Sequence, residues 1–401
     1  MMWRTLLAFA APVWFGVAAC RDATTPESSP AAAVPVPAAA ADGRVPGEYI
    51  VVFHPDVPDP PGLARRLVAA HGGTLRYVYT SALHGFAAAL PEAAVRALSR
   101  NPAVAYVEPD QVYTFDATTQ SMDTNGDPWG LDRIDQQALP LSRTYTYTAT
   151  GAGVHAYIID TGIWSLHPDF GGRADNVYDA FTFGLFGFTG EDCNGHGTHV
   201  AGTIGGATYG VAKGARLHGV RVLSCAGVGL TSQIIAGLDW VRQNHVKPAV
   251  ANLSLGGGLS TALNTATTNL ANAGVFVAVA AGNEDADACT TSPASAANVF
   301  TTAASTRTDA KASFSNWGTC VEAYAPGSAI VSDFILGLTM SLSGTSMASP
   351  HVAGVAVLYK AVNGDQPSAT VANWIIANAT TGVITGNRTG TPNRLVNKRG
   401  L

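Results

Sequence analysis

Charges and long apolar runs are the two features that this sequence has least of. Only 13% of its 401 residues are charged, the formal net charge is −5, and no long run of basic residues occurs. Proteins that bind nucleic acid carry a basic face or stripe, so we expect no nucleic-acid partner. After the N-terminus no uninterrupted apolar stretch approaches the roughly 18 residues of a membrane-spanning helix, so we expect no transmembrane segment there.

Cysteine is also scarce, and its five copies are informative. They are Cys20, Cys193, Cys225, Cys289 and Cys320. The first 20 residues contain Arg4, then an apolar run that ends in small residues, which predicts a signal peptide for export. An exported protein meets an oxidising compartment, so we expect structural disulfides. If Cys20 belongs to the signal region, four cysteines remain, and they allow three pairings.

The segment around Cys20 permits two interpretations. Val17, Ala18 and Ala19 before Cys20 resemble a bacterial lipobox, in which the cysteine is lipidated after cleavage. Valine at the first position and Arg21 after the cysteine depart from that pattern. A lipid-anchored precursor and an ordinary signal peptide with an incidental cysteine therefore both remain open.

Composition divides the rest of the chain into a linker and two folded regions. Residues 21–44 are dominated by Ala and Pro and predict a flexible or semi-extended linker. Residues 45–116 alternate short β-rich and helical patterns in the order βαββαβ, which predicts a small α+β, ferredoxin-like domain. The strands are expected at 48–53, 74–80, 85–90 and 104–107, and the helices at 61–70 and 91–99.

Residues 117–401 form the larger predicted domain. Apolar β-rich runs at 153–160, 217–223, 249–255 and 275–280 alternate with helical patterns, such as the amphipathic one at 231–245. This alternation predicts an α/β domain with a parallel sheet and helices on both faces. Function in such sheets collects at the carboxyl ends of the strands.

Three motifs fall at such positions. Asp160 ends a buried strand and is followed by Thr-Gly, His196 stands in Asn-Gly-His-Gly-Thr-His, and Ser346 stands in Gly-Thr-Ser-Met-Ala. A serine hydroxyl becomes a useful nucleophile when a histidine takes its proton and a carboxylate fixes that histidine's tautomer. An apolar helix is expected after Ser346, with Pro350 in its first turn.

Each motif alone has a simpler explanation. An aspartate at a strand end is usually a cap or turn residue, and Gly-x-Ser before a helix is commonly an N-cap. His196 and His199 could form a metal pair, but no third ligand motif accompanies them. All three motifs together, in the order Asp, His, Ser, favour a nucleophilic hydrolase.

From about Trp129 to Leu395 these motifs and their flanks resemble the subtilisin family of serine proteases, in the proteinase K and aqualysin branch. Residues 47–113 resemble the inhibitor-type propeptide of that family. The resemblance implies an exported serine endopeptidase, made as a zymogen that cleaves itself near Phe115, Asp116 and Ala117. The propeptide would be an intramolecular inhibitor, and proteins and peptides would be the substrates of a monomeric, secreted enzyme.

The same resemblance assigns the remaining site residues. Asn283 would donate to the oxyanion, although in isolation it could be a turn residue after a strand. Substrate would add a strand between 254–256 and 227–229, and an S1 pocket without an acid in its wall would prefer apolar or aromatic residues. Glu284, next to Asn283, could lie at the pocket rim and admit basic residues, or could be an ordinary surface glutamate. The substrate-binding residues implied are Gly227, Gly229, Ser254, Leu255, Gly256, Ala281 and Gly282.

Disulfides and calcium are implied in the same way. The resemblance favours the pairs Cys193–Cys225 and Cys289–Cys320. It implies no catalytic cofactor, and two structural calcium sites built from oxygen ligands. One site would use Ala297, Val299 and Glu322, although the family pattern usually has aspartate in place of Glu322. The other site would use Asp132, Asp135 and Gln136, which could equally form a solvated turn.

Two alternative functions predict sequence features that differ from those of a serine endopeptidase. A protease fold that has lost activity and serves as a binding protein would not need intact Asp160, His196, Ser346 and Asn283. An acyl hydrolase of another class predicts a Gly-x-Ser-x-Gly elbow and the order Ser, Asp, His, and neither occurs.

Overall fold

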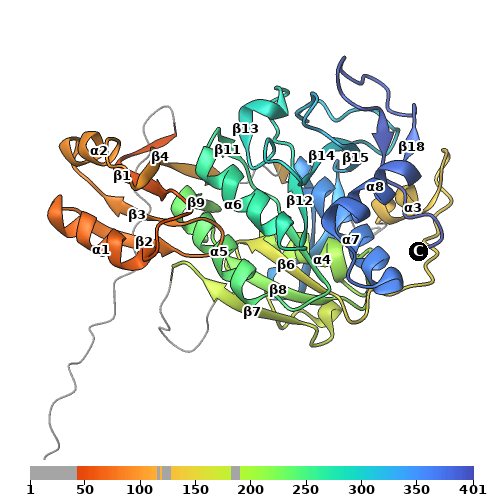
Figure 1. Ribbon diagram of the computed structural model, residues 1–401. Coiled ribbons are helices and arrows are strands. Elements are labelled where there is room, and N and C mark those ends of the chain that lie inside the picture. Colours follow the sequence, from red (N-terminus) through yellow and green to blue (C-terminus); the bar gives the residue numbers. More distant parts are fainter. Residues whose placement is uncertain (1–42, 115–117, 120–127, 182–189) are drawn as a thin grey trace, which may run out of the picture. The chain divides into compact units, whose positions relative to one another are not determined.

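Two large β-sheets organise the computed structural model (Figure 1). The structure describes residues 43–114, 118–119, 128–181 and 190–401. The predicted signal peptide, Cys20 and nearly all of the predicted linker lie outside these residues. None of the helices in the described part of the chain is long and apolar enough to cross a membrane.

The first sheet is antiparallel and belongs to the N-terminal domain, drawn in red and orange in Figure 1. Its core contains Val51, Phe53, Phe86 and Leu98, which pack together under the two helices. The elements follow the expected order: β1 (Arg44–Phe53), α1 (Pro60–Ala70), β2 (Thr74–Tyr79), β3 (Gly85–Ala89), α2 (Glu92–Leu98) and β4 (Val104–Thr114).

The last strand of this domain is longer than the sequence indicated. Strand β4 was expected to close at Val107, but it continues to Thr114. Its extension has a partner from the other domain, because Val112 to Thr114 pair antiparallel with β9 (Val228–Leu230). A strand persists where its backbone groups find partners, and a partner more than 100 residues away leaves no local signal.

The second sheet has nine strands in the order β18-β19-β15-β14-β12-β10-β6-β8-β7. All of its pairings are parallel except β18 with β19. The strands are β6 (His155–Asp160), β7 (Ala174–Asp179), β8 (Arg216–Arg221), β10 (Ala249–Leu253), β12 (Phe276–Ala280), β14 (Phe300–Ser305), β15 (Ala323–Pro326), β18 (Thr380–Thr381) and β19 (Arg394–Leu395). The predicted parallel α/β architecture is confirmed.

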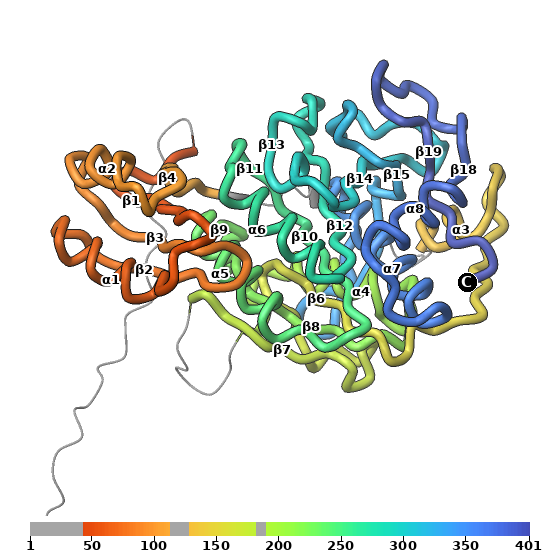
Figure 2. The backbone as a smooth tube through the Cα atoms, viewed as in Figure 1, coloured from red at the N-terminus to blue at the C-terminus, as the bar shows by residue number. Residues whose placement is uncertain are grey.

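Helices cover both faces of this sheet. Ile158 packs into the core beside α4 and α7, whereas its neighbour Ile159 packs into the core beside α5 and α6. This follows from the period of two along a strand and explains the continuous apolar runs. Figure 2 shows α4 beside α7 within the domain. The helices are α3 (Trp129–Asp135), α4 (His196–Gly205), α5 (Thr231–Asn244), α6 (Thr261–Asn272), α7 (Thr345–Asn363) and α8 (Ser368–Asn378).

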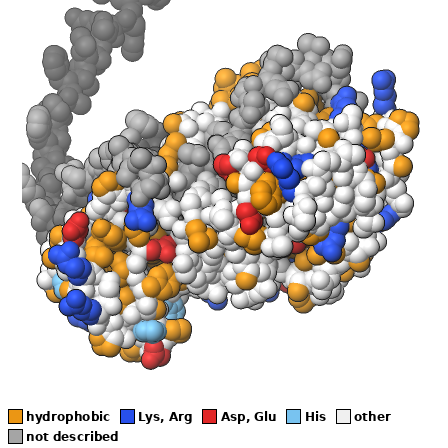
Figure 3. Space-filling view, turned by 90° about the horizontal axis from the view of Figure 1, so that it is seen from above, with side chains coloured by type: hydrophobic (Ala, Val, Ile, Leu, Met, Phe, Trp, Pro, Cys, Tyr) orange, Lys and Arg blue, Asp and Glu red, His pale blue; other side chains and the backbone are white. Residues whose placement is uncertain are grey.

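Short strands complete the described fold. Strand β11 (Gly257–Gly258) pairs with β13 (Thr291–Ser292), and β17 (Leu338–Ser343) pairs on its two sides with β16 (Ile330–Phe334) and β5 (Thr118–Thr119). On the face drawn in Figure 3, Lys and Arg side chains lie in small separate groups among apolar and uncharged ones.

Candidate active site

Asp160 and His196 meet at the carboxyl edge of the parallel sheet. Asp160 is the last residue of β6, His196 is the first residue of α4, and both side chains are buried. His196 Nδ1 lies 2.8 Å from Asp160 Oδ1. A proton on Nδ1 is therefore held by the carboxylate, and Nε2 is the basic nitrogen of the ring.

A second carboxylate, Asp192, fixes the start of α4. Its oxygens accept from the backbone N–H groups of Asn194 and Gly195 and from both the N–H and the hydroxyl of Thr198. Gly195 has a φ of 107°, and a Cβ there would lie 2.2 Å from the Phe334 ring. His196 is thus positioned by a network whose central carboxylate, Asp192, lies outside the motif that contains the histidine.

Ser346 lies in the first turn of α7, whose residues are buried from Thr345 to Lys360. Its Oγ donates to the carbonyl of Ser254 at 3.2 Å. Pro350 was expected in the first turn, but α7 begins at Thr345, so the proline lies in the second turn. Its missing N–H leaves the Ser346 carbonyl without its usual helical donor, and the Ser254 hydroxyl donates to that carbonyl at 2.7 Å instead.

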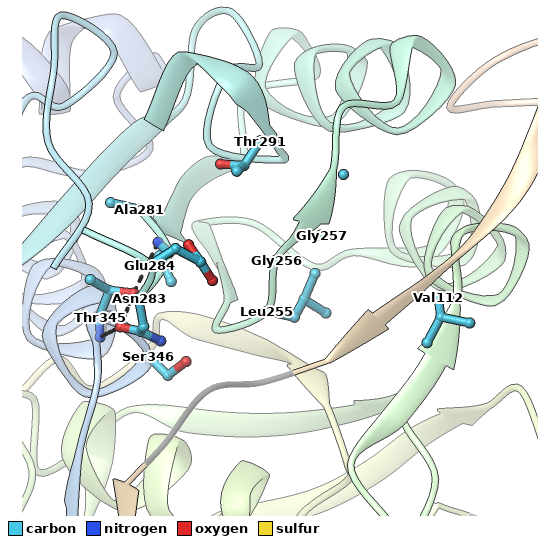
Figure 4. A pocket seen from close by; sticks show the side chains of 13 residues that line it. Val112, Leu255, Gly256, Gly257, Ala281, Asn283, Glu284, Thr291, Thr345 and Ser346 are labelled. Atoms are coloured by element: carbon cyan, nitrogen blue, oxygen red, sulfur yellow. Dashed lines mark hydrogen bonds between the residues drawn. The ribbon is translucent and has the colours of Figure 1, made fainter. Parts of the chain in front are cut away.

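Asn283 follows β12 and faces the same corner as Ser346 (Figure 4). Its Oδ1 accepts from the Thr345 N–H at 2.8 Å and from the Thr345 hydroxyl at 3.0 Å. With the oxygen held in this way, the amide NH₂ is the group presented to the cavity that Asn283 and Ser346 line together. An amide donor and a helix N-terminus are suited to stabilising an oxyanion.

Asn316 braces the loop that carries Asn283. Its Nδ2 donates to the Ala281 carbonyl, and its Oδ1 accepts from the N–H groups of Glu284 and Ala286. Asn316 is fully buried and lies 33 residues from Asn283 in the sequence. The local sequence, Ser-Asn-Trp, gives no signal of these contacts, so Asn316 is a positioning residue that no motif predicted.

A cavity of about 320 Å³ opens beside Ser346. Its walls come from 255–258 and 280–284, so the predicted Leu255, Gly256, Ala281 and Gly282 all line it. Glu284 also lines it, is exposed, and accepts from Asn316 Nδ2 at 2.8 Å. The cavity is therefore mainly apolar with one carboxylate at its edge.

The protein's own chain occupies the predicted substrate-binding edge. Val112 to Thr114 pair with Val228 to Leu230, one residue further along than the predicted 227–229. Gly229 has no room for a side chain, since a Cβ would lie 2.3 Å from the Val222 carbonyl oxygen. On the other side of the site, the backbone of Thr118 and Thr119 pairs with Ser343 and Leu342.

Two acidic side chains of β4 dock on helix N-termini. Asp110 accepts from the Ser232 N–H of α5 at 3.0 Å, and Glu108 accepts from the Ala262 N–H of α6 at 3.2 Å. Carboxylates are stabilised there by unpaired N–H groups and the helix dipole. Burial nevertheless raises the pKa of Asp110 to about 6 and also raises the pKa of Glu108.

Family models match both domains. A model of the subtilase family matches residues 151–397, and a model of peptidase inhibitor I9 matches residues 48–116. The chain belongs to the subtilase family.

Individual proteins similar to this subtilase are proteases as well. An extracellular serine proteinase of Thermus sp. (strain Rt41A) is 50% identical over 375 residues, which are 88% of this chain and 89% of that protein. A cuticle-degrading protease of Metarhizium anisopliae is 42% identical over 88% of this chain and 90% of its own length. The crystal structure of a cold-adapted subtilisin-like serine proteinase matches with a TM-score of 0.65 and 50% identity, covering 67% of this chain and 97% of that one.

The subtilase is thus a subtilisin-like serine protease with an inhibitor-type propeptide. No finding supports the alternative of an inactive scaffold. The structure contains the disulfides Cys193–Cys225 and Cys289–Cys320, the pairing that the resemblance implied. His199 is a buried structural residue, whose Nε2 lies 2.9 Å from the Ile330 carbonyl, and burial lowers its pKa to about 3.

The residues expected to hold calcium differ in how well they suit the ion. In the described residues no group of three or more His, Cys, Asp or Glu side chains could hold a metal. Around Glu322 the expected ligands are oxygens, which suit calcium. The Ala297 carbonyl accepts a hydrogen bond from Thr268, and Glu322 accepts one from Thr301. Each of these oxygens has a second lone pair with which it could bind an ion.

The loop of Asp132, Asp135 and Gln136 fits calcium less well. Asp132 Oδ1 and Gln136 Oε1 converge, but on the Ser142 N–H, at 3.2 and 2.9 Å. Asp135 forms an ion pair of 2.9 Å with Lys398. An ion here would have to displace protein donors, because the loop already satisfies its own oxygens.

Proposed function

We propose that this subtilase is an exported endopeptidase in which Ser346 attacks the peptide carbonyl. His196 accepts the Ser346 proton and returns it to the leaving amine, while Asp160 holds the tautomer and stabilises the imidazolium. The Ser346 N–H and the Asn283 amide stabilise the oxyanion. The observation that carries the proposal is the 2.8 Å contact between Asp160 and His196 at the same sheet edge as the N-terminus of α7.

Substitution of the nucleophile tests this mechanism. Ser346→Ala should abolish casein hydrolysis and leave the precursor uncleaved, because no other hydroxyl is placed by α7 in this way. Ser349→Ala, three residues further along the same helix, is the matched control and should keep activity, since Ser349 bonds Asn252 instead. Full hydrolysis by Ser346→Ala would contradict the proposal.

We further propose that the zymogen cleaves itself between Thr114 and Thr118. The support is that the two flanking segments pair with β9 and with β17, on either side of Ser346. An extended chain held on two strand edges is how proteases bind peptides by strand addition. The expected cleavage segment, Phe115, Asp116 and Ala117, lies outside the described residues, and N-terminal sequencing of the active enzyme would locate the cut.

The preferred residue before the scissile bond follows from the cavity beside Ser346. Its walls between 255–258 and 280–284 are glycine, alanine and leucine apart from Asn283 and Glu284. We infer a broad preference for apolar and aromatic residues, with basic residues admitted through Glu284. A peptide library varied at this one position measures the preference directly.

Calcium is proposed as a structural ion, held by the Ala297 and Val299 carbonyls and by Glu322. Its role would be to fix the segment before β14, with no part in the chemistry. At the loop of Asp132, Asp135 and Gln136 a second ion would have to displace the Ser142 N–H and open the ion pair between Asp135 and Lys398. Chelation should lower the melting temperature, and Glu322→Gln should remove most of that response.

Secretion is proposed from the extracellular relatives and the signal-like N-terminus. If Cys20 is lipidated, the lipid tethers only the precursor, because processing separates it from the catalytic domain. Mass spectrometry of the precursor's N-terminal peptide distinguishes this from an ordinary signal cleavage. We propose that the mature enzyme is a monomer, which light scattering would test.

A further inference from the structure

Three polar side chains form a hydrogen-bonded row far from the catalytic edge. His155 begins β6, His218 lies in the adjacent β8, and Asp175 lies in β7. His155 Nδ1 is 2.8 Å from His218 Nε2, and His218 Nδ1 is 2.6 Å from Asp175 Oδ1. Asp160 ends the same strand five residues later, about 16 Å away at the usual rise of a strand.

The proton positions in this row follow from its ends. A carboxylate only accepts, so His218 Nδ1 carries the proton that lies toward Asp175. In the neutral ring His218 Nε2 then has a lone pair, and it points at His155 Nδ1. The two rings are nearly parallel, at 6°, and Tyr157 stacks on His218 with centroids 4.9 Å apart. With His218 Nε2 as the acceptor, His155 Nδ1 is the donor of the hydrogen bond between the two rings.

A carboxylate behind an imidazole is also the arrangement that orients a histidine for metal binding. The acid fixes the tautomer and makes the opposite nitrogen more basic. We propose that His155 and His218 form a two-histidine site for a borderline transition-metal ion such as Zn²⁺, Ni²⁺ or Cu²⁺, with Asp175 as the supporting acid and water as the remaining ligands.

Binding replaces the proton between the two rings with the ion. His155 Nδ1 loses its proton, His155 Nε2 takes one up from solvent so that the ring stays neutral, and each of the two facing nitrogens forms one bond to the metal. A tetrahedral ion with Zn–N bonds of about 2.0–2.1 Å needs nitrogens about 3.3 Å apart. The present 2.8 Å must widen by about half an ångström, and His155, which is only partly buried, can supply this movement.

The charges around the site make its affinity adjustable. Asp175 is half-exposed and favours a cation, whereas Arg216, at the start of β8, is exposed and repels positive charge at His155. Imidazole ligands select these metals over calcium, which prefers oxygen. The ion would join β6 to β8 and stabilise the folded enzyme independently of calcium.

The test uses untagged mature enzyme, blocked at its serine and saturated with calcium, and titrated with ZnCl₂ and NiCl₂ by calorimetry. We expect one ion per chain, and an increase of about 5 °C in melting temperature at a hundredfold excess over Kd. His218→Gln should abolish binding, Asp175→Asn should weaken it about 10- to 100-fold, and Arg216→Gln should tighten it.

His245→Gln is the control, because this histidine instead bonds the Val241 carbonyl at the end of α5. It should bind the metal as the wild type does. Each variant is assayed for casein hydrolysis before blocking, which shows that it is folded. Absence of binding, binding that survives in His218→Gln, or no gain in Arg216→Gln would overturn the proposal.

Discussion

Asp333 is a buried carboxyl group whose protonation should control the stability of this subtilase at alkaline pH. It lies in β16 with no exposed side-chain surface. Burial and the negative charge of Asp169 raise its pKa to about 8, against the smaller opposing effects of Arg173 and Lys213. His167 Nδ1 is 3.6 Å from one of its oxygens.

The sign of the pH effect follows from this direction. The folded protein holds the Asp333 proton more tightly than the unfolded chain does. Asp333 therefore does not lower the free energy of unfolding below about pH 4, and lowers it progressively more between about pH 4 and about pH 8. The limiting slope is about 1.4 kcal/mol per pH unit. Because Arg173 and Lys213 can move toward the carboxylate, we expect about 1–3 kcal/mol of this cost at pH 8.

Asp333→Asn removes the cost and keeps a donor toward Asp169. In serine-blocked mature enzyme, calorimetry should show a melting temperature about 2–6 °C higher at pH 8 and little changed at pH 4.5. Asp365→Asn is a control of opposite sign, because Lys360 and Lys247 lower the pKa of Asp365. It should lose stability at pH 8 and at pH 4.5 alike, and lose little only well below the ordinary aspartate pKa of 3.8, where the carboxyl is protonated. Equal shifts for Asp333→Asn at both pH values would refute the reasoning.

Five further outcomes are expected. Asn283→Ala should lower kcat about 10²–10³-fold, the loss found when a subtilisin loses one oxyanion donor, with KM little changed. Asn316→Ala should also lower kcat, because it loosens the loop that carries Asn283. An effect of Asn316→Ala on KM alone would contradict this role. Glu284→Gln should lower kcat/KM for substrates with lysine before the scissile bond and leave phenylalanine substrates unaffected. Because burial in the complex raises the pKa of Asp110 to about 6, the cleaved propeptide should leave more slowly at pH 5 than at pH 8, and Asp110→Asn should reduce that difference. Replacing Cys193 and Cys225 by serine should cost about 3–4 kcal/mol in the loop-entropy picture, read as a lower melting temperature at fixed calcium.

Local patterns were sufficient for most of the elements and for the motifs that contain Asp160 and His196, which the structure brings into contact. The alternating apolar runs predicted β6, β10 and β12 within two residues, because strands buried on both faces must be apolar throughout. Asp160 and His196 stood in motifs at strand and helix ends, where a parallel sheet brings side chains together. The extension of β4 to Thr114 and the second-turn position of Pro350 were missed, since each depends on a partner distant in the chain.

The sequence alone therefore determined the class of fold, the order of the nucleophilic motifs and the presence of an inhibitor-like domain. Only the tertiary structure decided what holds those residues in place. Asp192, Asn316 and Ser254 are polar residues with no motif of their own, and they act because folding brings buried donors and acceptors within bonding distance. The same is true of His155 and His218, whose 2.8 Å contact exists only because β6 and β8 are neighbours.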